Sequence, residues 1–166
     1  MNGCLHDQKV VGFTSVVGDF MHAGHVLMLT ECKRYCDYLY VGIINDPTKD
    51  RPWKHKPVQS LFERYVQVAS HKCVDEVVPL DGEADLDLAL RSLPIDVRFV
   101  GEDYQGKDFT GKETCEKLGI RIVYNRRKHG LSSSELRERM NKAAEGGEPD
   151  GICDSIVQKG VQAGNA

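Results

Sequence analysis

The sequence predicts an α/β fold, a doubly wound five-stranded parallel sheet with helices on both faces. Two observations lead to this prediction. Five short runs rich in β-branched residues alternate along the chain with segments whose apolar residues have helical spacing, and this alternation is typical of a parallel sheet with right-handed crossovers. The chain has 166 residues, which is enough for about one domain with a single core.

Each expected element has its own local signal. Strands are expected at residues 10–17, 38–44, 74–79, 97–101 and 120–124, and helices at residues 24–35, 60–69, 85–92, 114–118 and 133–144. Gly18-Asp19 ends the first strand and Gly119 ends the fourth helix, because glycine favours turns and helix stops. We expect one domain over residues 9–144 and a mobile, glycine-rich tail over residues 145–166.

Composition excludes several classes of protein. Hydrophobic residues make up 40% and charged residues 28% of the chain, so collagen-like, low-complexity and wholly disordered chains are excluded. The net charge of −3 argues against a binder of nucleic acid or of anionic membrane. The sequence contains no window of 18 or more apolar residues, and residues 1–9 lack the basic-then-apolar order of a signal peptide. We therefore expect a soluble, cytoplasmic protein.

The cysteines predict packing rather than chemistry. None of the six is spaced as C-x2-C, so the framework of a zinc ribbon or thioredoxin-like motif is missing and reduced thiols are expected. Leu29, Cys32 and Cys36 follow the spacing of a buried helical stripe. These two cysteines are therefore expected in the core.

The segment from Gly18 to His25 (GDFMHAGH) lies where the first strand ends and the first helix begins. His22 and His25 are three residues apart on the first helical turn, so their imidazoles point the same way, and Gly24 allows a bulky group near the backbone. A helix N-terminus favours anions, and imidazole N–H groups stabilise charge on a phosphoryl group. The alternatives are a core histidine at 25, or a metal site for which only Asp19 is near as a further ligand.

Two more segments predict phosphate binding. Ser132, Ser133 and Ser134 open the last helix directly after the basic residues 126–129; one serine is explained as an N-cap, and three suggest a phosphate cradle. The loop over residues 49–56 (KDRPWKHK) has four cations and one acid. It is either a solvated surface loop or a lid whose lysines close over phosphates. We expect these segments to form a basic pocket within an acidic chain.

The chain also has near matches to another phosphate-binding motif. Residues 101–107 and 106–112 have the glycine and lysine spacing of a P-loop, but Asp108 and Glu113 stand where that motif needs Ser or Thr. No GxGxxG motif occurs. P-loop ATPases and dinucleotide dehydrogenases are therefore disfavoured.

Taken together, these residues resemble the HxGH nucleotidyltransferases, and among them the cytidylyltransferases, most closely the glycerol-3-phosphate type. The resemblance covers about residues 10–140. It rests on His22-Ala-Gly-His25, Glu63-Arg64, Val74-Asp-Glu-Val77, Gly101-Glu-Asp-Tyr104 and Arg127-Lys-His-Gly130-Leu-Ser132-Ser133-Ser134. It implies a Rossmann-like fold and transfer of CMP from CTP to a phosphorylated alcohol. That alcohol would be glycerol 3-phosphate, or phosphoethanolamine or phosphocholine, and pyrophosphate would be released.

The resemblance also implies residue roles. His22 and His25 would stabilise the α-phosphate in the transition state, Lys54 or its neighbour Lys56 would reach the phosphates, and Arg127 would neutralise the leaving pyrophosphate. The implied nucleotide-binding residues are Val17, Gly18, Asp19, Gly24, Lys56, Gly101, Asp103, Gly130, Leu131, Ser132, Ser133 and Ser134. Mg²⁺ would be held mainly by the triphosphate, with no protein ligand assigned. A homodimer without stable membrane association is expected.

The chain departs from the family pattern at three places. The Gly-x-Phe-Asp that usually precedes the histidines is replaced by residues 16–19 (VVGD), and the usual Arg-Tyr before Val74 is Lys72-Cys73. The usual Arg-Thr-Glu-Gly is replaced by residues 127–130 (RKHG). Two alternatives stay open. One is an adenylyltransferase of the same fold acting on a sugar phosphate, against which Arg127 counts because the heptose-phosphate adenylyltransferases lack an arginine there. The other is a non-catalytic nucleotide-binding module.

Overall fold

The computed structural model describes residues 9–126 and 131–146, and the chain divides into two compact units, residues 1–127 and 128–166. In the first unit the strands are β1 (Val11–Val16), β2 (Tyr38–Ile44), β3 (Glu76–Leu80), β4 (Val97–Gly101) and β5 (Arg121–Asn125). The helices of that unit are α1 (Ala23–Lys33), α2 (Leu61–Ala69), α3 (Glu83–Ser92), α4 (Lys112–Leu118) and the 3₁₀ helix η1 (Glu102–Tyr104). The second unit contains α5 (Ser133–Ala144). The predicted tail beyond residue 146 lies outside the described residues.

The five strands form one parallel sheet in the order β3-β2-β1-β4-β5. The chain builds one half outward from β1 and then returns to the centre to build the other half. The predicted doubly wound α/β fold is therefore confirmed. Ligands of such sheets bind beyond the carboxyl ends of the strands where the order reverses, which here is between β1 and β4.

The hydrogen-bonded ladder between β1 and β4, where the strand order reverses, is short. Strands β1 and β2 pair over six residues, from Val11 to Val16. Strands β1 and β4 pair only at Gly12↔Val97 and Phe13↔Arg98, although both strands continue further. The carboxyl ends of the two central strands are therefore adjacent without being joined by a continuing ladder.

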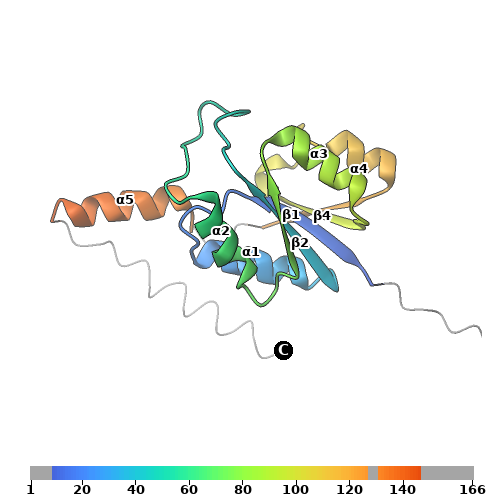
Figure 1. Cartoon of the computed structure of the whole chain (residues 1–166), viewed down its shortest axis with the longest axis horizontal. Helices are drawn as coiled ribbons and strands as arrows, with labels where there is room; N and C mark the ends of the chain where they lie inside the picture. The colour runs from blue at the N-terminus through green and yellow to red at the C-terminus, as the bar shows by residue number, and fades with distance from the viewer. Residues whose placement is uncertain (1–8, 127–130, 147–166) are drawn as a thin grey trace, which may run out of the picture. The chain divides into compact units, whose positions relative to one another are not determined.

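Each face of the sheet has its own apolar core. On one face, Leu29 and Cys32 of α1 and Val68 of α2 pack against β2, β3 and β4. On the other, Leu86 and Leu90 of α3 and Cys115 of α4 belong to a core that contains Phe13 and Leu80. Figure 1 shows the two pairs of helices on opposite sides of the sheet. Burying each such large apolar side chain is worth about 1.5–3 kcal/mol.

The cysteine predictions are confirmed for the described part of the chain. Cys32, Cys36, Cys73 and Cys115 are free and buried. Leu29, Cys32 and Cys36 belong to one core cluster, as their helical spacing predicts. Gly12 lies against this stripe so closely that a Cβ would come within 2.6 Å of Cys36 Sγ.

The observed elements differ from the expected ones by no more than two residues at any end, and two of the shifted starts have a visible cause. Strand β3 begins at Glu76 rather than Val74, because the Val74 N–H turns back to the carbonyl of His71. Helix α3 begins at Glu83, where the carboxylate of Asp50 accepts its backbone N–H. The short helix η1 was not expected. Over residues 9–126 and 131–146, none of the helices is long and apolar enough to traverse a bilayer.

Candidate active site

The turn that joins β1 to α1 contains two left-handed residues, Gly18 with φ 73° and Phe20 with φ 50°. Glycine adopts this conformation readily, whereas a residue with a Cβ pays about 1–2 kcal/mol. Asp19 lies between them and is buried, and its carboxylate accepts the backbone N–H groups of Val58 (3.1 and 3.2 Å) and Gln59 (3.0 Å). This turn includes Gly18 and Asp19, which belong to the segment that departs from the family pattern. Asp19 thus fixes it to Val58 and Gln59, shortly after the loop 49–56.

The two histidines cap helix α1. His22 is the N-cap residue, and its Nδ1 accepts the Gly24 N–H at 3.0 Å, while the His22 N–H donates to Nδ1 of His25 at 3.4 Å. The ring centroids are 4.2 Å apart, so the structure brings the imidazoles together as their spacing predicts. A neutral imidazole that accepts at Nδ1 carries its proton on Nε2. Both rings therefore have an Nε2–H group that can donate to a phosphate oxygen. Neither histidine is a buried core residue.

Arg64 of α2 is the site residue for which sequence reasoning gave no role. Its side chain is 1% exposed and donates to four carbonyls, those of Val17 and Ile44 (2.7 Å from Nη1), Asn45 (2.7 Å from Nη2) and Gln59 (3.2 Å from Nε). Burial lowers the pKa of this guanidinium, against the opposing effect of nearby carboxylates. The available signal was an arginine within the buried stripe of an amphipathic helix.

Val17 directly follows β1, and Ile44 ends the neighbouring strand β2. Arg64 consequently fixes the carboxyl ends of β1 and β2 against each other and against the start of α2. The Val17 backbone is expected to face the nucleotide, and its carbonyl is held in place by the Arg64 guanidinium.

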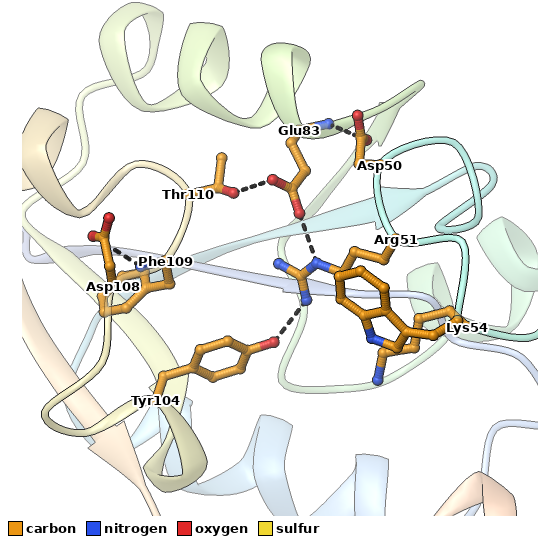
Figure 2. A pocket seen from close by; sticks show the side chains of 9 residues that line it. Asp50, Arg51, Lys54, Glu83, Tyr104, Asp108, Phe109 and Thr110 are labelled. Carbon is orange, nitrogen blue, oxygen red and sulfur yellow. Dashed lines mark hydrogen bonds and ion pairs between the residues drawn. The ribbon is translucent and has the colours of Figure 1, made fainter.

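The loop 49–56 is fastened at its first three residues. Lys49 pairs with Asp81 at 2.7 Å, which raises the pKa of Lys49. Arg51 donates from Nε to Glu83 Oε1 at 2.7 Å and from Nη1 to the Tyr104 hydroxyl at 2.6 Å, and Figure 2 shows it between these partners. Two of the loop's four cations are therefore engaged with protein groups. Lys54 and Lys56 are exposed.

A cavity of about 370 Å³ lies beside this loop. Its lining residues are Asp50, Arg51, Trp53, Lys54, Glu83, Tyr104, Asp108, Phe109 and Thr110 (Figure 2). Three carboxylates face two cations, so the cavity carries a formal charge of −1. This cavity is not basic, because acids from α3 and from the segment before α4 accompany the loop's cations. The predicted basic pocket also includes residues 126–128, of which 127 and 128 lie outside the described residues, so it stays a prediction. Lys54 lines the cavity, and Lys56 is not among its lining residues.

The other predicted residues of the first unit gather at the same edge of the sheet. Gly24 lies buried in the first turn of α1. Gly101 ends β4, and Asp103 lies in η1 directly after it. Because β1 and β4 are neighbouring parallel strands, Val17 and Gly18 share this edge with Gly101. Across the described ranges 9–126 and 131–146, no three His, Cys, Asp or Glu side chains are grouped as metal ligands.

The serine segment belongs to the second unit, where Leu131 precedes the helix. Ser132 is the N-cap of α5: its Oγ accepts the Glu135 N–H at 3.2 Å, and its own N–H donates to the Glu135 carboxylate at 2.8 Å. The N-cap explanation accordingly accounts for one serine, and Ser133 and Ser134 form the first turn of the helix. Arg127 and Gly130 lie outside the described residues.

A parallel sheet of this order, with a histidine pair capping the helix that follows the first central strand, defines the class of the protein as a nucleotidyltransferase. Comparison with known families agrees, since residues 18–139 match the model described as Cytidylyltransferase-like. The chain belongs to this cytidylyltransferase-like family. The resemblance inferred from the sequence is confirmed at this level.

The chain is also similar to individual proteins over most of its own length. The chain is 36% identical over 138 residues to the bifunctional protein HldE of Caulobacter sp. (strain K31), covering 82% of this chain and 28% of that protein. It is 32% identical over 136 residues to HldE of Campylobacter jejuni subsp. jejuni (strain 81116), covering 81% and 28%. The chain thus spans little more than a quarter of these relatives' length.

Solved structures agree with the fold. A lipopolysaccharide core biosynthesis protein from Thermoplasma volcanium has a TM-score of 0.57 and 26% identity, covering 71% of this chain and 95% of that one. Pantothenate synthetase from Thermus thermophilus has a TM-score of 0.50 and 16% identity, covering 83% and 71%. The second similarity concerns the fold alone.

Proposed function

We propose that this domain is an adenylyltransferase that transfers AMP from ATP to the phosphate of a sugar phosphate and releases pyrophosphate. The observation that carries the transfer chemistry is the histidine pair on the N-terminus of α1, with Nδ1 of each ring occupied by a backbone N–H. The similarity to HldE proteins and to a lipopolysaccharide core biosynthesis protein supports the adenylyl and sugar-phosphate assignment.

The reaction is one in-line displacement at the α-phosphorus. An oxygen of the acceptor phosphate forms a new bond to this phosphorus, and the bond to the bridging oxygen breaks, with its electron pair leaving on pyrophosphate. The Nε2–H groups of His22 and His25 and the helix N-terminus donate to the α-phosphate oxygens as their charge rises. Lys54 supplies a cation from the loop. No proton transfer by the protein is required.

Mg²⁺ fits this scheme as a cation that the nucleotide's phosphate oxygens coordinate. The Asp19 carboxylate is engaged by Val58 and Gln59, and the described part of the chain has no three-residue metal-ligating cluster. The cation would therefore be held mainly by triphosphate oxygens, where it neutralises charge.

The cavity beside the loop 49–56 favours an acceptor that contains a sugar ring. Its aromatic lining comes from Trp53, Tyr104 and Phe109, and Asp108 adds a carboxylate that can accept hydroxyl groups. Its charge of −1 suits a hydroxylated ring better than a second phosphate. A volume of about 370 Å³ is within the usual range of small-molecule sites and exceeds what glycerol fills.

A second candidate is the cytidylyl reaction, in which CTP and glycerol 3-phosphate, phosphoethanolamine or phosphocholine are the substrates. The segment Arg127-x-x-Gly130-x-Ser132-Ser133 favours it, as does the similarity to the cytidylyltransferase-like family model. In either case we propose a homodimer, which sedimentation analysis would test as twice the mass of 18.6 kDa.

One experiment separates these functions. Pyrophosphate release is measured with each of four nucleoside triphosphates against a panel of hexose and heptose 1-phosphates, glycerol 3-phosphate, phosphoethanolamine and phosphocholine. We expect turnover with ATP and a sugar phosphate. Turnover only with CTP and a phospho-alcohol would replace the adenylyl assignment by the cytidylyl one. Nucleotide binding without turnover for any pair would make the domain a non-catalytic module.

A further inference from the structure

The turn ahead of the histidine pair has a conformation that its own sequence does not favour. Phe20 has φ 50°, and it is the one described residue other than glycine with a positive φ. A residue with a Cβ is strained there and persists only where its surroundings fix it. Two residues later His22 is the N-cap of α1. Whatever holds Phe20 in this conformation also sets where α1 starts.

Gln59 provides the fixation. Its side-chain Oε1 accepts the Phe20 N–H at 2.7 Å. Its backbone N–H donates to the Asp19 carboxylate at 3.0 Å, and its backbone carbonyl accepts from Arg64 Nε at 3.2 Å. Three polar groups of Gln59 thus bind the turn and the Arg64 guanidinium. The two backbone interactions would survive any side chain at 59, and only the bond to Phe20 depends on glutamine.

Gln59 also lies three residues after the loop 49–56, which carries Lys54. The first residues of that loop are fastened to α3 and η1 through Arg51. Its other end is fastened to the turn through Val58 and Gln59. The loop and the histidine turn therefore share one anchoring point.

We propose that Gln59 is a positioning residue: by holding Phe20 in its left-handed conformation, it sets the position of His22 and His25 relative to the loop that bears Lys54. It touches no reacting atom in this scheme and acts through the turn. Without the bond the turn relaxes toward an ordinary backbone conformation, and the imidazoles shift at the start of α1. Small displacements of catalytic groups are costly, up to about 100-fold in rate for 1 Å.

The first test is a double-mutant cycle measured by pyrophosphate release, and it rests on the proposed function. Gln59→Met keeps the size of the side chain and removes the acceptor, so kcat is expected to fall about 10-fold with KM for the nucleotide changed less than about 3-fold. Phe20→Gly removes the strain of the turn. In that background Gln59→Met should lower kcat less than about 3-fold, because coupled residues are non-additive. Equal losses in both backgrounds, or no loss, would overturn the proposal.

The second test does not depend on the reaction. Hydrogen exchange of the Phe20 amide is measured in the full chain with Gln59→Met, with Gln59→Glu, which keeps an acceptor oxygen, and with Gln67→Met as control. The Oε1 of Gln67 accepts no hydrogen bond from the described residues. We expect faster exchange only in Gln59→Met. Unchanged exchange there would refute the positioning role even if the enzyme is active, whereas faster exchange in a chain that turns over no substrate pair would refute the proposed function alone.

Discussion

Replacing Arg64 by methionine tests how much the carboxyl edge of the sheet depends on one buried cation. The substitution keeps an apolar stem and removes donors from the carbonyls of Val17, Ile44, Asn45 and Gln59. Four hydrogen bonds to a charged group are worth about 6–12 kcal/mol at about 1.5–3 each. Desolvating the guanidinium offsets several kcal/mol of this. We therefore expect a net loss of about 3–5 kcal/mol.

Urea unfolding followed by circular dichroism measures this loss. With a slope of about 2 kcal/mol per molar, Arg64→Met should lower the unfolding midpoint by about 2 M. The matched control is Arg34→Met at the C-cap of α1. The Arg34 side chain is exposed, so this substitution should shift the midpoint by less than about 0.3 M. A shift for Arg64→Met no larger than that of the control would refute the assignment of Arg64 as the residue that joins the strand ends.

Three further predictions concern other parts of the molecule. His22→Ala should lower the rate of pyrophosphate release about 10²–10³-fold, as loss of an oxyanion-type donor does. Burial raises the pKa of the Cys32 thiol to about 12, so iodoacetamide at pH 8 should leave Cys32 unlabelled in the folded chain and label it in urea, as read by mass spectrometry. Burial acts to raise the pKa of Asp75, but hydrogen bonds from Lys33 and the Leu39 N–H outweigh it and leave that pKa lowered. The stabilisation by Asp75 is therefore present above about pH 4 and is lost as pH falls through the lowered pKa. Asp75→Asn should cost up to about 1 kcal/mol at pH 7 and less at pH 3, by urea unfolding at both values.

Local signals predicted most of the fold. Strand β2 has the expected bounds, 38–44, because its apolar run is closed by the turn at Asn45-Asp46-Pro47. Helix α5 has the expected bounds because Ser132 and Glu135 form a capping box. Strand β3 begins two residues later than expected because the Val74 N–H turns back to the carbonyl of His71. The apolar run at residues 74–79 does not reveal where this turn ends and the ladder begins.

In the candidate site, too, contacts between residues close in the sequence can be predicted, and contacts between distant residues cannot. The approach of His22 and His25 follows from a capping interaction over three residues, so the local sequence predicts it. The partners of Arg51 are 32 and 53 residues away. Counting charges along the loop 49–56 therefore cannot show that folding brings Glu83 and Asp108 into the cavity that Arg51 and Lys54 line. The role of Arg64 does not follow from the sequence, because its four acceptors are backbone carbonyls that no side-chain pattern reveals.

Capping of α1 by its own histidines has a consequence for how copies of this domain diverge. A copy that no longer needs the chemistry still needs an N-cap at position 22, where Nδ1 of His22 satisfies the Gly24 N–H. Asparagine, aspartate and serine cap as well as or better than most residues, whereas aliphatic residues do so poorly. Lineages that lose the reaction but keep the fold should therefore drift at position 22 toward these small polar residues, and an aliphatic residue there should be rare in active and inactive lineages alike.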